Sequence, residues 1–229
     1  MNVHLLYFFM VLPFSMKLLI SGKLDKKHHG IYLLFLLIFF LGLLGISQLL
    51  FPGGYDWTHR FISEEGNPDK NPLGWVFFTI SICGTSLLFI PNSLYIYRLL
   101  KPRMLIFSRI NLGFLLLGSI GLFIVGSVNE NIRYIHDFGA ILAFGSYGAG
   151  AFCSFIICLR KNILRESWPP MAGFLFLFGI IINLGIYIAY NYAHITSFNF
   201  AEGAKYQWSS FWLILTYFCG MYLLSWLKK

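Results

Sequence analysis

Residues 31–51 read IYLLFLLIFFLGLLGISQLLF, and this uncharged apolar run decides the fold. A helix needs about 20 apolar residues to cross the hydrocarbon core of a bilayer. Lipid offers no hydrogen-bond partner to backbone N–H and C=O groups, so a run of this kind is expected to be helical. The run therefore predicts a helix that spans a membrane.

Similar apolar runs follow along the rest of the chain. They are too long and too continuously apolar for the strands of a membrane barrel, in which apolar and polar residues alternate. We therefore expect an all-α fold, a polytopic transmembrane bundle of six helices in one domain over residues 31–229. The expected helices lie near residues 31–51, 73–97, 105–126, 136–159, 170–190 and 207–227.

The composition excludes a soluble globular protein. Of the 229 residues, 58% are hydrophobic and only 11% are charged, whereas soluble domains carry about 25% charged residues. A net charge of +8 in a soluble chain would suggest nucleic-acid contacts, but the sequence has no basic helix, zinc knuckle or phosphate loop. We expect membrane lipids as partners and no nucleic acid.

The basic residues predict the orientation of the bundle. Lysines and arginines gather before the first span, between the second and third, between the fourth and fifth, and after the sixth. Because basic residues are enriched in cytoplasmic loops, both termini are expected in the cytoplasm. The outer loops hold most of the acidic residues and few basic ones, namely Arg60, Lys70, Arg133 and Lys205.

Residues 1–30 form an apolar and basic segment before the first span. Its apolar stretch is broken by Pro13 and ends at Lys17, and it lacks the basic start and small-residue cleavage site of a signal peptide. We expect an interfacial or disordered segment. The alternative is a seventh span over residues 3–20, which would place the N-terminus outside.

The fourth span carries small residues at helical spacing, since Ser146, Gly150 and Ser154 recur every four residues. Small residues at this spacing let helices approach closely, so we expect this helix at the centre of the bundle. The same face could contact a second copy or another protein, which leaves the oligomeric state open. Asn111 and Asn183 lie within spans, where an interhelical hydrogen bond is expected of each.

The first outer loop, residues 53–68, reads GGYDWTHRFISEEGNP. Asp56 is a good helix N-cap and Gly66 a good helix stop, so the loop predicts a short helix over residues 57–65. At helical spacing Glu65 falls on the apolar face and Glu64 at its edge. A carboxylate aimed toward a membrane bundle is costly unless it is paired or accepts hydrogen bonds.

His136 and Asp137 begin the fourth span on the same outer side. A histidine beside carboxylates can shuttle protons near neutral pH, and histidines with acids can bind a metal. Three interpretations stay open: a structural network that ties the first loop to the fourth span, a ligand or lipid-headgroup site, and a catalytic or metal site. The candidate ligand-binding residues are Glu64, Glu65, His136, Asp137 and His59.

A catalytic version of this cluster would use His136 as the base, Asp137 or Glu64 to orient it, and Ser63 as the nucleophile. The sequence has no H-E-x-x-H, C-x-x-C or G-x-S-x-G motif. We therefore predict neither a metal nor a cofactor.

Three segments resemble a known family of six-helix membrane proteins. Residues 61–66 with two prolines soon after resemble its "I-S-acid-x-G … P" motif, Tyr97-Arg98 resembles its aromatic-plus-basic helix end, and residues 135–140 resemble its "H-D-x-G-A" helix start. The family is that of the damage-regulated autophagy modulator-like proteins, with a branch that remodels the lipids of glycosylphosphatidylinositol anchors and uncharacterised prokaryotic relatives. The resemblance covers residues 31–227.

The resemblance implies a membrane-organising or lipid-related role at the plasma membrane or an endolysosomal membrane. It implies that Glu64, His136 and Asp137 form the polar centre, and it implies no established enzyme mechanism for the autophagy branch. One departure is Gln207-Trp208, where relatives often have an acidic residue before the tryptophan. Any role that needs a carboxylate at position 207 is therefore in doubt.

Three functions follow from these observations. The first is a non-enzymatic integral membrane protein that organises the membrane or binds lipid or a partner through the outer polar cluster. The alternative is a lipid-modifying acyl transferase or hydrolase. A second alternative is a small-solute transporter, which would need a water-filled cavity reaching the middle of the bundle.

Overall fold

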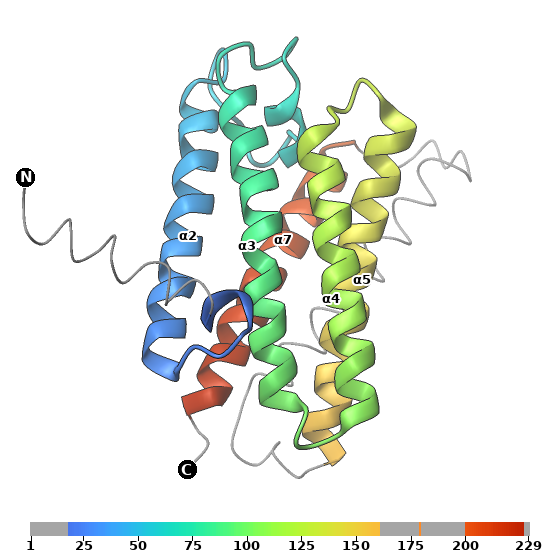
Figure 1. The fold of residues 1–229 in the computed structure, drawn as a ribbon. Helices are drawn as coiled ribbons and strands as arrows, with labels where there is room; N and C mark the ends of the chain where they lie inside the picture. The colour runs from blue at the N-terminus through green and yellow to red at the C-terminus, as the bar shows by residue number, and fades with distance from the viewer. Residues whose placement is uncertain (1–17, 161–178, 180–199, 227–229) are drawn as a thin grey trace, which may run out of the picture.

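The computed structural model describes residues 18–160, 179 and 200–226, and within these ranges every regular element is a helix (Figure 1). The all-α prediction is confirmed for this part of the chain. The elements are α2 (Lys26–Leu49), the 3-10 helix η1 (Ile62–Gly66), α3 (Trp75–Leu100), α4 (Leu105–Ser127), α5 (Arg133–Arg160) and α7 (Phe200–Trp226).

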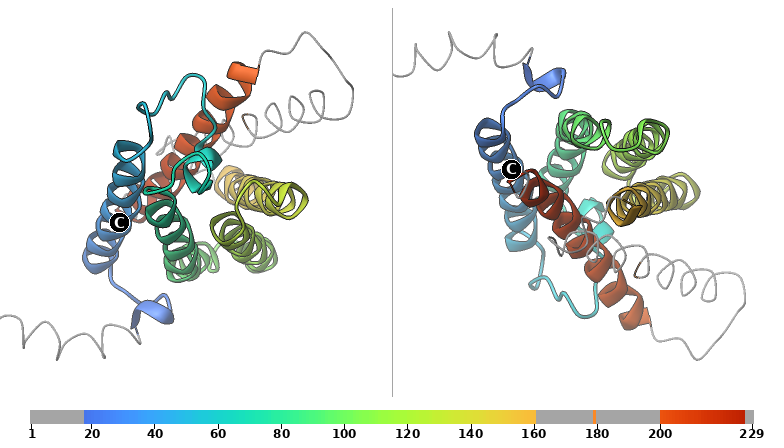
Figure 2. Two further views of the ribbon diagram at one scale, coloured as in Figure 1. Left: turned by 90° about the horizontal axis from the view of Figure 1, so that it is seen from above. Right: turned by 90° about the horizontal axis from the view of Figure 1, so that it is seen from below.

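Helices α2, α3, α4 and α5 run side by side, and each points in the opposite direction to the one before it (Figure 1). α3 packs between α2 and α4, and α5 packs along α4. α7 crosses behind these helices at an angle, as Figure 2 shows from both ends. We call the end where α2 stops, α3 starts and η1 lies the η1 end; the loop between α4 and α5 is at the same end (Figure 1).

Within the described part of the chain, four helices, α2 to α5, are long and apolar enough to cross a membrane. They match the spans predicted near residues 31–51, 73–97, 105–126 and 136–159. The predicted span 207–227 falls on α7, which begins earlier than expected. The predicted span 170–190, with Asn183, and the segment before residue 18 lie outside the described residues, residue 179 excepted.

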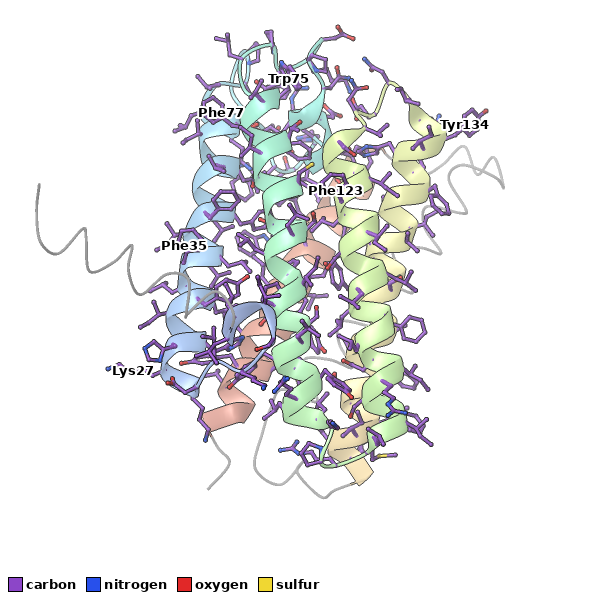
Figure 3. All side chains as sticks on the ribbon, viewed as in Figure 1. Lys27, Phe35, Trp75, Phe77, Phe123 and Tyr134 are labelled. Carbon is purple, nitrogen blue, oxygen red and sulfur yellow. The ribbon has the colours of Figure 1, made fainter. Side chains whose placement is uncertain are left out.

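Exposed side chains on the long helices suit a lipid environment. Figure 3 labels Phe35 and Phe123, which point away from the bundle along its length and are exposed. Trp75 and Tyr134 are exposed at the η1 end, and Lys27 lies at the opposite end. Aromatic rings at the border of an apolar band are typical of membrane-spanning bundles.

The backbones of α4 and α5 approach each other closely at Gly121. A Cβ added at Gly121 would lie 2.4 Å from the backbone nitrogen of Ala143 and 2.7 Å from the carbonyl oxygen of Gly139. Only a residue without a side chain fits between backbones this close. The separation of α4 and α5 at this point therefore requires glycine at position 121.

The predicted small-residue row of the fourth span faces the interior of the bundle. Ser154 is buried and its hydroxyl accepts a hydrogen bond of 2.8 Å from Nδ2 of Asn111. The same nitrogen donates to the carbonyl oxygen of Gly150, and the Ser154 hydroxyl lies 2.8 Å from that of Tyr217 on α7. The interhelical hydrogen bond predicted for Asn111 is thus confirmed.

Candidate functional site

The loop after α2 turns sharply instead of forming the predicted helix. Asp56 accepts hydrogen bonds of 2.9 Å from the backbone N–H of Thr58 and 2.6 Å from its hydroxyl, and lies 2.7 Å from Nδ1 of His59. The helix predicted over residues 57–65 is wrong, because a side chain that binds the next backbone groups offers an alternative to helical hydrogen bonds. Only residues 62–66 are helical, as the 3-10 helix η1, which ends at the predicted stop Gly66.

The same hydrogen bonds keep Asp56 ionised. Those from Thr58, followed by that from His59, lower the pKa of the Asp56 carboxyl to about 2. The carboxylate is more than half exposed. Asp56 therefore presents a negative charge to its surroundings at any physiological pH.

Glu64 lies between two cations. Its carboxylate is buried and accepts a hydrogen bond of 3.1 Å from Nη1 of Arg60, and it lies 3.6 Å from Nζ of Lys70. The side chains of Arg60 and Lys70 keep 39% and 42% of their surface exposed. The Arg60 guanidinium also lies 4.7 Å from the centre of the Phe51 ring, which fixes the position of the guanidinium over an aromatic face.

Glu130 joins this loop to the connection between α4 and α5. Its carboxylate lies 2.7 Å from Nζ of Lys70 and accepts hydrogen bonds from Nδ2 of Asn67 at 2.9 Å and the Ser63 hydroxyl at 3.5 Å. Asn131 adds a second link, since Asn67 donates to its side-chain oxygen at 3.0 Å. Hydrogen bonds thus connect the first loop to Glu130 and Asn131, which precede α5, and none of these bonds involves His136 or Asp137.

Glu65 is fully buried on the other side of η1. Nε2 of Gln48 donates a hydrogen bond of 2.9 Å to one carboxyl oxygen, and the other oxygen has no partner among the described residues. Burial raises the pKa of Glu65 to about 8, and the hydrogen bond from Gln48 opposes this rise. The carboxyl is therefore protonated at neutral pH, which removes the cost of a buried charge.

Asn71 connects η1 to the end of α2 through hydrogen bonds. Its Nδ2 lies 3.1 Å from the carbonyl and hydroxyl oxygens of Ser47 and from the carbonyl oxygen of Glu65. Its Oδ1 accepts from the N–H of Gly74 just before α3. One buried amide thus connects α2, η1 and α3.

The start of α7 completes the support of the loop. Oε1 of Gln207 accepts the backbone N–H of Ile62 at 2.8 Å, and the indole N–H of Trp208 donates to the carbonyl oxygen of Arg60 at 3.3 Å. The Trp208 ring stacks on Trp57 with ring centres 4.6 Å apart. Gln207, the departure from the resembled motif, acts here as a hydrogen-bond acceptor.

The other predicted site residues, His136 and Asp137, also lie at the η1 end, at the start of α5. Nδ1 of His136 donates a hydrogen bond of 2.7 Å to the carbonyl oxygen of Val128, and Asp137 lies 3.4 Å from Arg133. Among the residues described, no hydrogen bond or ion pair joins His136 to Ser63 or Glu64, and no group of three potential metal ligands is found. The contacts described for Ser63 and His136 are with Glu130 and the Val128 carbonyl, and the catalytic interpretation stays a prediction.

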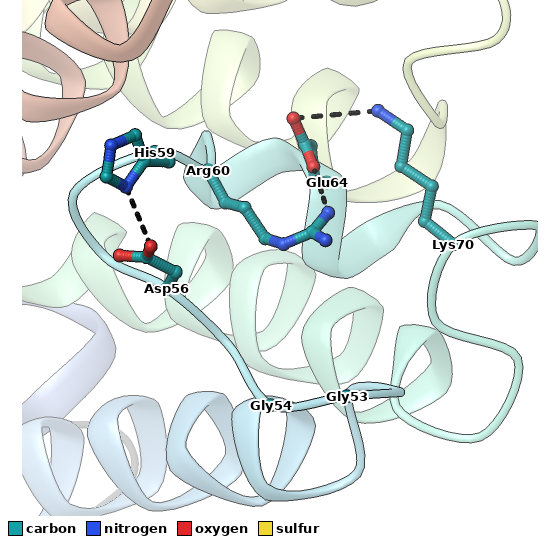
Figure 4. A pocket seen from close by; sticks show the side chains of 7 residues that line it. All are labelled: Gly53, Gly54, Asp56, His59, Arg60, Glu64 and Lys70. Atoms are coloured by element: carbon teal, nitrogen blue, oxygen red, sulfur yellow. Dashed lines mark hydrogen bonds and ion pairs between the residues drawn. The ribbon is translucent and has the colours of Figure 1, made fainter.

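An open pocket of about 540 Å³ lies over the loop (Figure 4). His59 and Glu64 were predicted site residues, whereas Glu65, His136 and Asp137 do not line it. The cations of the pocket were missed, because the sequence does not show that they surround a buried carboxylate. The lining residues are Gly53, Gly54, Asp56, His59, Arg60, Glu64 and Lys70.

No family model, curated protein or solved structure matches this chain. The resemblance to the autophagy modulator-like family therefore stays a prediction. The features of the described residues that bear on function are the pocket at the η1 end and the apolar helices next to it.

Proposed function

We propose that the chain is a non-enzymatic, membrane-organising protein that binds the phosphate of a lipid headgroup in the pocket at the η1 end. The proposal includes six spans, both termini in the cytoplasm, and the η1 end on the outer side of the plasma membrane or an endolysosomal membrane. The charge bias of the loops and the family resemblance support these finer points. The four apolar helices support the membrane location itself.

The main support for the proposal is the partial exposure of the Arg60 and Lys70 side chains at the pocket. Both contact the buried carboxylate of Glu64, yet each keeps about two fifths of its side chain exposed at the pocket. A guanidinium has five N–H donors, so Arg60 retains donors for a second anion. Lys70 already contacts Glu64 and, at 2.7 Å, Glu130, and its ammonium group has three donors, so it retains at least one for a further anion. The guanidinium fork matches the geometry of a phosphate.

The position of the pocket also fits a headgroup. It lies just beyond the ends of α2 and α3, at the end of the bundle where Trp75 and Tyr134 are exposed. Aromatic residues of this kind mark the headgroup level of a bilayer. The enzyme alternative has less support, because the hydroxyl of Ser63 contacts Glu130 and the imidazole of His136 contacts a backbone carbonyl.

Native mass spectrometry of the purified protein tests the proposal by counting the phospholipids retained during stepwise delipidation in detergent. We expect the wild-type chain to retain phospholipid and Lys70→Gln to lose most of it. The matched control is Lys205→Gln, because this exposed lysine lies on α7 near Gln207 but outside the pocket lining. Equal retention by the folded Lys70→Gln and Lys205→Gln variants would show that the pocket does not bind the phosphate.

A further inference from the structure

The described side chains that line the pocket carry equal numbers of positive and negative charges. Arg60 and Lys70 supply two positive charges, and Asp56 and Glu64 supply two negative charges. Glu130, outside the lining, adds a third carboxylate 2.7 Å from Nζ of Lys70. A purely anionic ligand would meet at least as many carboxylates as cations. A ligand that carries one charge of each sign matches this lining better, because each of its charges can lie against an opposite one.

The two carboxylates differ in what they already bind. Glu64 is buried and contacts both cations. Asp56 is exposed, and among the residues described it has no lysine or arginine partner, since its contacts are Thr58 and His59. Asp56 is therefore the carboxylate that is available to a positive group of a ligand.

The opposite charges are also separated along the pocket. Figure 4 shows Asp56 and His59 on one side and Lys70 on the other, with Arg60 and Glu64 between them. Gly53 and Gly54 form the remaining edge with φ angles of +75° and +86°, and a Cβ added to either meets nothing within 4 Å. A ligand can thus lie along this edge, with its negative group toward Arg60 and Lys70 and its positive group toward Asp56.

The chemistry of the lining also distinguishes between kinds of ammonium group. A quaternary ammonium has no N–H donor and is held by the faces of aromatic rings. Among the described residues that line the pocket there is no phenylalanine, tyrosine or tryptophan. A primary ammonium has three N–H donors, and a carboxylate such as that of Asp56 accepts them.

We propose that the pocket selects a phospholipid headgroup with a primary ammonium, of the phosphoethanolamine type. The phosphate binds Arg60 and Lys70, and the ammonium donates hydrogen bonds to the carboxylate of Asp56. This inference rests on the proposed function, because it assumes that the pocket binds a headgroup phosphate. The inference adds the chemical class of the headgroup and names Asp56 as the residue that recognises its ammonium group.

The test uses the full chain in nanodiscs of equal parts phosphatidylethanolamine, phosphatidylcholine and phosphatidylglycerol, followed by native mass spectrometry of the retained lipids. We expect phosphatidylethanolamine to be enriched over phosphatidylcholine by about tenfold, which one charge-assisted hydrogen bond can provide. Lipids with one and two N-methyl groups should bind in decreasing order. Equal retention of all headgroups would overturn the inference and leave phosphate binding intact, whereas retention of no phospholipid would overturn both proposals.

Asp56→Asn is the decisive variant, because asparagine keeps the turn-forming side chain and removes the charge. It should still retain phospholipid but lose the preference for phosphatidylethanolamine. Asp25→Asn is the matched control, since Asp25 forms the same contact with a histidine three residues later, 2.6 Å from His28, at the opposite end of the bundle. A preference that survives Asp56→Asn unchanged would overturn the role of this carboxylate.

Discussion

The buried carboxyl of Glu65 makes the stability of the protein depend on pH. Its pKa is about 8 in the folded chain, against an ordinary value of 4.5. The folded state therefore holds a proton that the unfolded state releases between these two values. The stabilisation is complete below about pH 4.5, decreases as the pH rises, and is lost once the pH passes about 8.

The magnitude follows from the size of the pKa shift. One pKa unit corresponds to about 1.4 kcal/mol, so the free energy of unfolding should decrease by about 3 kcal/mol between pH 5 and pH 8 through this group alone. Glu65→Gln replaces the protonated acid with a neutral group of the same shape. It should match the wild-type chain near pH 5 and exceed its stability by about 3 kcal/mol at pH 8.

The assay is unfolding by SDS in mixed detergent micelles at a series of pH values, followed by tryptophan fluorescence. Gln48→Leu provides a second comparison, because the hydrogen bond from Gln48 lowers the pKa of Glu65. Without it the loss of stability should move to higher pH. Parallel curves for the wild-type chain and Glu65→Gln between pH 5 and pH 9 would show that the Glu65 carboxyl does not hold an extra proton in the folded chain.

Two further predictions concern the packing and the polar support of the bundle. Gly121→Ala should lower the free energy of unfolding by about 1–3 kcal/mol, since the new Cβ meets the backbone of Ala143. Gly113→Ala, whose Cβ meets nothing within 4 Å, should leave the free energy of unfolding unchanged or raise it by up to about 1 kcal/mol in the same assay. An equal loss in both variants would contradict the close approach at Gly121. Asn71→Ala removes the amide that bonds to Ser47, Glu65 and Gly74. The free energy of unfolding should fall by about 3 kcal/mol, and an unchanged value would contradict the role of this amide.

The apolar runs predicted the helices well because the signal repeats over 20 residues or more. The spans on α2, α3, α4 and α5 agree with the sequence to within a few residues. Asn111 was also predictable, since a lone amide inside an apolar run has few partners except other helices. The conformation of the first loop was not predictable from the sequence. The Asp56 carboxylate binds the backbone N–H and the hydroxyl of Thr58, and these hydrogen bonds compete with those of a helix.

The polar contacts of the site were less predictable than the spans. Glu130 and Gln207 have no local pattern that marks them, and each contacts a loop residue far away in the sequence. The same holds for His29, which is buried against α3 with Nε2 2.9 Å from Oδ1 of Asn92. Side-chain contacts between distant residues depend on which helices pack against each other. A single sequence does not show which helices are neighbours.

The contacts between Ile62 and Gln207 and between Arg60 and Trp208 also have a consequence for the order of assembly in the cell. The loop that bears the pocket leaves the ribosome early, whereas α7, which holds its backbone, leaves more than a hundred residues later. The loop therefore has its full set of backbone contacts only after α7 has been inserted. A chain truncated before Phe200 would insert its first helices but lack these two loop contacts, so lipid binding at the η1 end would report on the insertion of α7.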